Sequence, residues 1–143
     1  MKRTLSALAT TVLLAACATA PGGKPDAQLL ETYWKAVELE GAPVETRAGT
    51  REAHLILRTE KNMAGGFSGC NSVRGAYEVS GGSLRFKQMA STLMACLPAV
   101  SDVEKRFNSA LAASSGYRIS GDSLELRDTD GKVRARFTAV HLR

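Results

Sequence analysis

Residues 65–77 read Gly-Gly-Phe-Ser-Gly-Cys-Asn-Ser-Val-Arg-Gly-Ala-Tyr, and this stretch places the strongest constraint on the fold. Four of its thirteen residues are glycine, at positions 65, 66, 69 and 75, but Phe67, Val73 and Tyr77 argue against a flexible loop. Glycine within a strand marks a bulge or a close approach of another backbone. We therefore expect strongly bent strands here, with Cys70 in a strand-like segment.

Short runs of alternating apolar and polar residues make up most of the remaining chain. Such alternation is typical of strands with one buried and one solvated face. The runs cover residues 33–40, 53–58, 83–87, 117–120, 124–127 and 133–139. Gly81-Gly82, Gly121-Asp122 and Asp130-Gly131 have the chemistry of hairpin turns, Asp130-Gly131 most clearly. Sequential hairpins predict an antiparallel sheet.

One helix is predicted after Pro98. Ser101 and Glu104 have the spacing of a capping box, and Gly116 fits a helix stop. Phe107 and Leu111 lie on one face of this helix, so we expect it to cover the open face of the sheet and bury both side chains. The predicted fold class is α+β.

The first residues have the features of a secretory signal. Lys2 and Arg3 precede an apolar run that ends at Ala16, and the run is shorter than the roughly 20 residues that span a bilayer. Leu14-Ala15-Ala16-Cys17 resembles the bacterial lipobox, in which the cysteine is lipidated and becomes the first residue. The alternative is an ordinary signal peptide with a stray cysteine. Ala18, in place of an aspartate, favours the outer membrane over the inner membrane, with the domain facing the periplasm.

These features divide the chain into three parts. We expect a signal peptide over residues 1–16, the lipidated Cys17 with a flexible linker over 17–29, and one domain over 30–143. The chain has a net charge of +5, and removing the signal with its two cations leaves about +3. Because no basic block remains, nucleic acid is not an expected partner.

The chain has three cysteines, an odd number that leaves one without a disulfide partner, and the lipobox accounts for that one. If Cys17 carries lipid, Cys70 and Cys96 remain as a pair in an oxidising compartment, where we expect them to form a disulfide worth roughly 3 kcal/mol. One alternative is a catalytic thiol with His54 or His141 as its base. Another is a zinc site, although Cys-x-x-Cys and His-x₃-His spacings are missing. We expect no metal and no cofactor.

A hydrolase is the other enzymatic alternative. Ser68 lies among glycines but not in a Gly-x-Ser-x-Gly elbow. Carboxylates are available, although nothing in the sequence pairs them as acid and base; they are Glu38, Glu40, Glu45 and Asp102. We therefore expect no enzymatic activity.

Two separate motifs resemble the META domain family, which includes HslJ-like bacterial proteins. The family combines an early tryptophan, a Gly-Cys-Asn-x-x-x-Gly-x-Tyr core and a Thr-x-Met-Ala-Cys segment before a helix. The matching residues are Trp34; Gly69, Cys70, Asn71, Gly75 and Tyr77; and Thr92, Met94, Ala95 and Cys96. Val73 departs from the pattern, because members often carry an aromatic residue there.

The resemblance implies a twisted antiparallel sheet curled into a partial, cracked β-barrel with one helix packed against it. It also implies an envelope protein associated with stress tolerance, and it transfers no catalytic residues. The expected function is that of a non-enzymatic outer-membrane lipoprotein that binds or stabilises an envelope protein or an apolar ligand. The alternative is an envelope hydrolase, or a thiol- or metal-dependent protein that uses Cys70 and Cys96.

Overall fold

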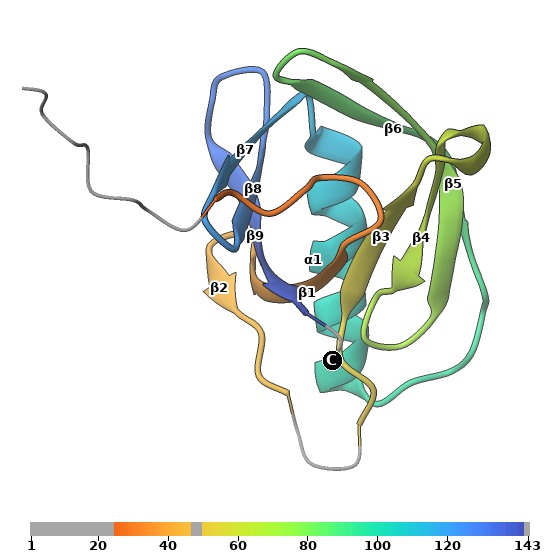
Figure 1. Cartoon of the computed structure of the whole chain (residues 1–143). Helices are drawn as coiled ribbons and strands as arrows, with labels where there is room; N and C mark the ends of the chain where they lie inside the picture. The colour runs from red at the N-terminus through yellow and green to blue at the C-terminus, as the bar shows by residue number, and fades with distance from the viewer. Residues whose placement is uncertain (1–24, 47–49, 142–143) are drawn as a thin grey trace, which may run out of the picture.

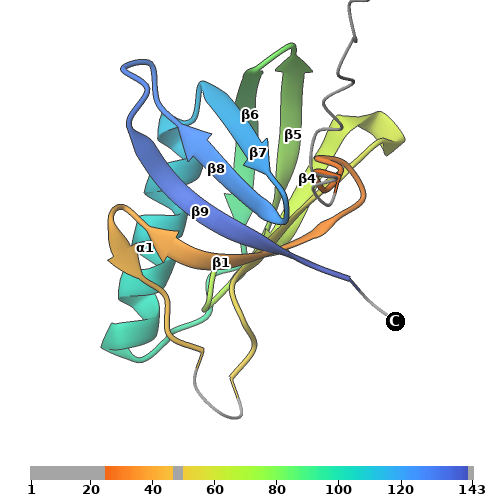
Figure 2. The same cartoon turned by 60° about the vertical axis from the view of Figure 1, so that its left-hand side comes forward.

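A computed structural model describes residues 25–46 and 50–141 (Figure 1). Within these residues, nine antiparallel strands form one sheet in the order β2-β1-β3-β4-β5-β6-β7-β8-β9. Strand β1 also pairs with β9, so the sheet curls into a ring, and the two strands run side by side in Figure 2. The strands are β1 Tyr33–Leu39, β2 Ala42–Pro43, β3 His54–Arg58, β4 Met63–Phe67, β5 Ser72–Ser80, β6 Ser83–Ser91, β7 Gly116–Ser120, β8 Ser123–Arg127 and β9 Val133–Val140.

The α+β fold class is confirmed, because the ring carries one α-helix among the described residues, α1, at Pro98–Ala113. Alternating patterns determine which side of each strand faces inward. In β8, Leu124 and Leu126 are buried, whereas Glu125 between them pairs with Arg127 and Arg136 on the outer face. The ring therefore encloses one apolar core.

The seam between β6 and β7 is the weakest part of the ring. Within the described ranges, these strands pair at one position, Ser83 with Gly116. Helix α1 packs against β9, β1, β6 and β8 and buries Phe107 and Leu111, as predicted. The Phe107 ring meets Phe137 of β9 edge-on, with 6.2 Å between ring centroids.

The expected helix boundaries were wrong. The helix begins at Pro98, three residues before Ser101, and Leu97 is the N-cap residue without a side-chain cap. Proline suits the first helical position because its φ is already helical and its missing N–H needs no partner. Gly116 does not stop the helix, which ends at Ala113; it is the first residue of β7.

The expected turns were mostly right. Gly81 and Gly121 lie in tight turns with φ of +56° and +58°. The Asp130-Gly131 pair instead belongs to a longer connection, residues 128–132. Asp128 shapes this connection, because its carboxylate accepts hydrogen bonds from the backbone N–H groups of Asp130 and Lys132.

The glycines of residues 65–77 have different roles. Gly66 lies in β4, where a Cβ atom would come within 2.0 Å of the His54 carbonyl oxygen. Gly75 lies at a bulge of β5, under the Met89 side chain. Gly69 lies in the turn between β4 and β5 with φ of +101°. Close backbone approach, a bulge and a bend of the backbone at Gly69 were predicted. Cys70 was expected in a strand-like segment, but it follows Gly69 in this turn and lies in no strand.

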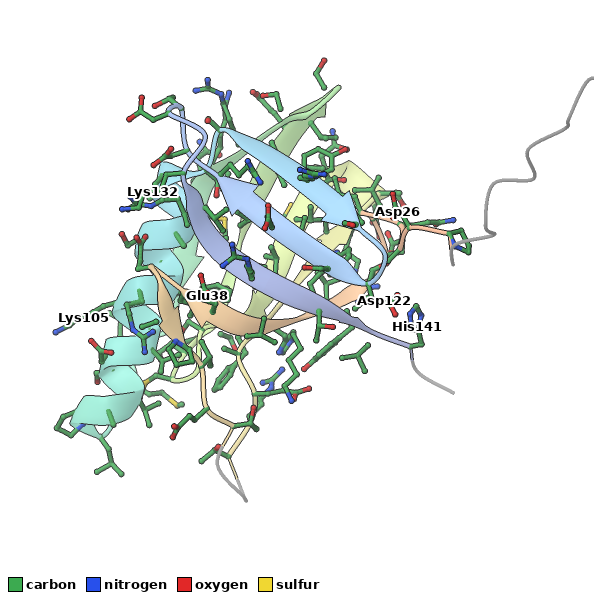
Figure 3. The ribbon with its side chains drawn as sticks, turned by 90° about the vertical axis from the view of Figure 1, so that its left-hand side faces the viewer. Asp26, Glu38, Lys105, Asp122, Lys132 and His141 are labelled. Atoms are coloured by element: carbon green, nitrogen blue, oxygen red, sulfur yellow. A yellow bond between two sulfur atoms is a disulfide. The ribbon has the colours of Figure 1, made fainter. Side chains whose placement is uncertain are left out.

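Both ends of the described chain meet at the β7–β8 turn. The Gly121 N–H donates to Asp26 Oδ1 over 2.6 Å, and the Ala27 N–H donates to the Gly121 carbonyl. His141 contacts Asp122 at 2.9 Å. Figure 3 shows Asp26, Asp122 and His141 at one side of the molecule, with Lys105 of α1 at the other.

Candidate functional site

The connection from β6 to α1 presents an unusual apolar surface, which we call the apolar loop and define as residues 92–97. Three large apolar side chains extend from it into solvent: Leu93 is 96% exposed, Met94 62% and Leu97 74%. Exposed apolar side chains gathered in one place mark interaction sites more often than scattered ones do. In Figures 1 and 2 this connection lies across the molecule from the first described residues.

Asn71 holds the backbone of this loop. Its Oδ1 accepts hydrogen bonds from the Met94 N–H and the Thr92 hydroxyl, each over 2.8 Å. Its Nδ2 donates to the Met94 carbonyl at 3.4 Å and to Glu104 Oε2 at 3.2 Å. Because Asn71 is itself buried, these bonds form away from competing water.

Two further attachments fix the loop at Cys96, near its C-terminal end. Cys70 and Cys96 form a disulfide with 6.1 Å between their Cα atoms, as the sequence predicted. Ser101 Oγ donates to the Cys96 carbonyl, although the capping box had assigned it to a helix N-terminus. Glu104, the other expected capping residue, instead contacts Ser68 Oγ at 3.3 Å and Asn71. The loop is therefore tied to both the sheet and the helix.

The residues of the family motif fall into two groups. One group surrounds the apolar loop and comprises Gly69, Cys70, Asn71, Thr92, Met94, Ala95 and Cys96. A Cβ atom at Gly69 would come within 2.9 Å of Val103 in α1, so this glycine lets the turn pack against the helix.

The second group belongs to the core. Trp34 is fully buried, and its Nε1 donates to the Leu29 carbonyl. Tyr77 is buried and donates to the Arg58 carbonyl, and Gly75 provides the β5 bulge. Val73, where the motif departs from the family, is also a buried core residue. Cys17 lies outside the described residues.

Sequence reasoning missed Leu93 and Leu97, and it considered Ser68 and Glu104 for other roles, in a hydrolase and in a helix cap. The available signal was the run Leu93-Met94-Ala95-Cys96-Leu97, which is apolar but follows neither a strand nor a helix period. An apolar run without a periodic partner face indicates either a buried connection or an exposed binding surface. Burial distinguishes the two, and here the run is exposed.

A group of titratable side chains lies at the junction of β1 and β3. The rings of Tyr33 and His54 stack with centroids 4.3 Å apart, and Lys35 bridges Glu52 at 2.7 Å. Burial, helped by the charge of Glu52, raises the pKa of Tyr33 to about 12. Burial also lowers the pKa of His54, and the bond from Lys35 lowers the pKa of Glu52. At neutral pH this group therefore consists of a neutral stacked pair beside a closed ion pair.

The residues considered for catalysis are dispersed. Ser68 is fully buried. Glu38, Glu40 and Asp102 each pair with an arginine: Arg136, Arg134 and Arg106, respectively. Glu45 is exposed in the connection after β2. His141 contacts Asp122, across the molecule from the apolar loop.

The cysteines considered for metal binding are consumed by the disulfide. Within residues 25–46 and 50–141, no group of three or more histidine, cysteine, aspartate or glutamate side chains is placed to hold a metal ion. None of the helices in this part of the chain is both long enough and apolar enough to cross a membrane.

Two hollows border α1. One, of about 430 Å³, lies between the helix and β6 and is lined by Val73, Phe86, Met89, Ala90, Ser91, Asn108, Leu111 and Ala112. The other, of about 280 Å³, lies beside the first turns of α1, with Val44 and Val103 in its wall and Arg51 and Glu52 among its charged residues. Thr46 and Thr50 also line the second hollow, and residues 47–49 between them in the sequence lie outside the described ranges.

Comparison with solved structures supports the fold. An NMR structure of a protein from Burkholderia xenovorans matches with a TM-score of 0.63 and 22% identity, over 92% of this chain and all of that one. A second NMR structure matches with a TM-score of 0.60 and 22% identity, over 77% of this chain and 90% of that one. Among curated proteins there is no significant match.

The family comparison reaches the same residues as the two motifs. The META domain model matches residues 27–141, which is most of the sequence. The chain belongs to the META domain family.

Proposed function

We propose that this protein is a non-enzymatic binding domain of the bacterial cell envelope that acts in envelope stress tolerance. A lipid on Cys17 holds it at the outer membrane, with the domain in the periplasm, and the apolar loop contacts an envelope partner. The observation that carries this proposal is the exposure of Leu93, Met94 and Leu97 on a backbone held by a disulfide and by Asn71. Such a surface is already ordered, so binding costs little conformational entropy.

The shape of the loop favours a particular kind of partner. A protruding loop cannot enclose a small molecule, whereas its leucine side chains fit an apolar pocket on another protein. Large side chains that fill such pockets usually supply most of the binding energy of an interface. The expected partner is therefore a folded envelope protein with an apolar pocket.

The proposed tether is compatible with this arrangement. Seven residues lie between Cys17 and Pro25, so eight Cα-to-Cα steps join them (25 − 17), which gives a reach of at most about 28 Å. Asp26 and Ala27 are bonded to the β7–β8 turn, across the molecule from the apolar loop. A lipid at Cys17 therefore leaves the loop free to face away from the anchoring membrane.

Photo-cross-linking in growing cells tests the binding role. A photoreactive residue at Leu93 should give a discrete cross-linked product, because this side chain is 96% exposed. The same residue at Val79, which is 40% exposed on β5, is the matched control and should not give that product. Reduction of the disulfide should weaken the Leu93 product by releasing the loop. Identical products at both positions would contradict the binding role of the loop.

A separate experiment tests the anchor. Replacing Cys17 with serine should abolish incorporation of labelled palmitate and release the protein from the membrane fraction. Unchanged labelling of the Cys17→Ser variant would disprove the lipid anchor, and it would leave the cross-linking result to be judged independently.

A further inference from the structure

Strand β6 has an open edge. It pairs with β5 along its length, but on the other side the described residues show pairing with β7 at Ser83 alone. The last hydrogen bond from β6 on that side runs from the Leu84 N–H to the Ser115 carbonyl. From Arg85 to Ser91 no residue of β6 is buried, and Phe86 and Met89 are half-buried. An open edge of this kind is a template for another extended chain.

Strand alternation shows which backbone groups the edge offers. The backbone N–H and C=O groups of alternate residues point to the same edge of a strand. Because the Leu84 N–H points toward β7, the backbone groups of Phe86 point to that edge as well. On the other side of the β5 bulge at Gly75, the Thr92 N–H donates to the Ser72 carbonyl of β5. The backbone groups of Ser91 and Met89 therefore point away from β5. Gln88, with φ of +50°, is an extra residue at this bulge, so the outward backbone groups after Phe86 belong to Met89 and not to Gln88. The open edge therefore presents the N–H and C=O groups of Phe86, Met89 and Ser91.

The same three residues line the hollow of about 430 Å³ beside α1. Leu111 and Ala112 form its helical wall, and Asn108 supplies a polar side chain. Ligand pockets in proteins have volumes of about 300–1,000 Å³. This hollow therefore combines apolar walls with a row of backbone hydrogen-bonding groups.

We propose that the β6 edge and this hollow bind an extended segment of another envelope protein by strand addition. Alternate apolar side chains of the segment enter the hollow, and its backbone pairs with Phe86, Met89 and Ser91. The proposal goes beyond the binding role of the apolar loop, because it assigns a second surface and an extended partner segment to the domain. Main-chain pairing supplies affinity and the side-chain pocket supplies specificity in this mode of recognition.

Other occupants fit less well. A lipid chain would cover the edge without pairing its backbone groups, and buried unpaired amides are costly. In a pair of β6 strands from two copies of the chain, Arg85 and Lys87 of one copy would lie across from the same residues of the other copy. Like charges directly across a strand pair repel. Residues 18–24 of this chain contain no large apolar side chain that could enter the hollow.

The test uses the full chain in lipid nanodiscs, because detergent would compete for an apolar hollow. A displayed library of 12-residue peptides is selected against the wild type, and the best binder is synthesised as the probe. Ala112→Glu places a charge in the wall of the hollow, whereas Ser109→Glu makes the same change at an exposed α1 position outside the lining. Both positions are exposed, so both variants should fold.

The proposal predicts at least 10-fold weaker probe binding to Ala112→Glu and unchanged binding to Ser109→Glu. Two N-methylated probes are compared, one methylated at its odd-numbered residues and the other at its even-numbered residues. One of them should lose binding and the other should keep it, because an added strand bonds its neighbour through every second residue. Binding should also slow hydrogen exchange at the amides of Phe86, Met89 and Ser91. Equal binding of both N-methylated probes, or no selected peptide that distinguishes Ala112→Glu from the wild type, would overturn the proposal.

Discussion

Asn71 links the two motifs of the family because each of its side-chain atoms serves a different segment. Its oxygen accepts from Thr92 and Met94, while its nitrogen donates to Glu104. An aspartate has the same shape but cannot donate, and an alanine would leave the Met94 N–H without this acceptor. The amide is therefore the side chain that meets both requirements at this position.

Asn71→Asp should lower the free energy of unfolding by about 3 kcal/mol at pH 7, because donors are lost and two carboxylates then lie close together. A proton bound between two neighbouring carboxylates relieves their repulsion, so part of the loss should return as the pH falls from 7 into mild acid. Urea unfolding across this pH range measures both effects. Asn108→Asp, an exposed control on α1, should change the free energy of unfolding by less than about 0.5 kcal/mol.

His54 should make the fold sensitive to mild acid. Burial lowers its pKa below the ordinary 6.5, so the unfolded chain takes up a proton at a pH where the folded protein does not. Stability should therefore fall as the pH drops below about 6.5 and continue to fall until the lowered pKa is reached. Tyr33, Glu52 and Arg51 are the titratable groups around it.

His54→Gln should flatten the dependence of stability on pH between 7 and 5, whatever its effect on absolute stability. His141→Gln, which removes the exposed histidine, should leave most of the slope in place. The carboxylates with lowered pKa values, Glu31, Glu52 and Glu125, lose their contribution at lower pH, below their ordinary 4.5. Equal slopes for wild type and His54→Gln would rule out this role.

At the scale of elements, β4 contains a matched pair of glycines. A Cβ atom at Gly66 would lie 2.0 Å from the His54 carbonyl oxygen, whereas one at Gly65 would lie 3.8 Å from the Val73 carbonyl oxygen. Because the obstacle at Gly66 is backbone, β3 and β4 would have to separate to accept a side chain.

Gly66→Ala should therefore cost about 3 kcal/mol of unfolding free energy, the upper part of the usual range for overpacking. Gly65→Ala should be neutral or stabilise by up to about 1 kcal/mol, because alanine restricts the unfolded chain. Chemical denaturation of the two variants decides the point. A similar loss in both would show that the approach of β3 and β4 is not what requires glycine.

Elements with a strong local signal were predictable from the sequence, and elements set by distant contacts were not. Leu124 and Leu126 alternate with polar residues, and Phe107 and Leu111 share a helical face, so their burial followed from periodicity. Ser101 and Glu104 matched a capping box, but Pro98 began the helix earlier. Both side chains then bonded to groups that only the folded chain brings near, Cys96, Ser68 and Asn71.

The site divides in the same way. Cys70 and Cys96 were identified by counting cysteines, and Asn71 by its motif. The exposure of Leu93 and Leu97 depends on how β6 leaves the sheet, and no local pattern encodes that path, although Pro98 marks where α1 begins. The open edge of β6 likewise requires knowledge of the sheet order.

For the molecule as a whole, the arrangement of the two ends of the described chain predicts that the fold tolerates circular permutation. Asp26 bonds Gly121, and His141 contacts Asp122, so both ends lie at one turn. A permuted chain that joins residue 141 to residue 26 through a short Gly/Ser linker and opens at Gly81-Gly82 should fold, because this turn is exposed. Its circular dichroism spectrum should match that of the wild type. A permutant opened between Leu55 and Ile56, within β3, should fail and serves as the control.

The pairing of β1 with β9 also has a consequence for the time at which the protein can fold. Trp34 lies opposite Ala139, 105 residues later in the chain (139 − 34). At about 5–20 residues per second, the ribosome needs roughly 5–20 s to make the partner strand after Trp34 has been synthesised. During that interval the edge of β1 that pairs with β9 has no partner strand and is available to chaperones and proteases. A chain cut short before β9 is therefore a substrate for degradation rather than a smaller working domain.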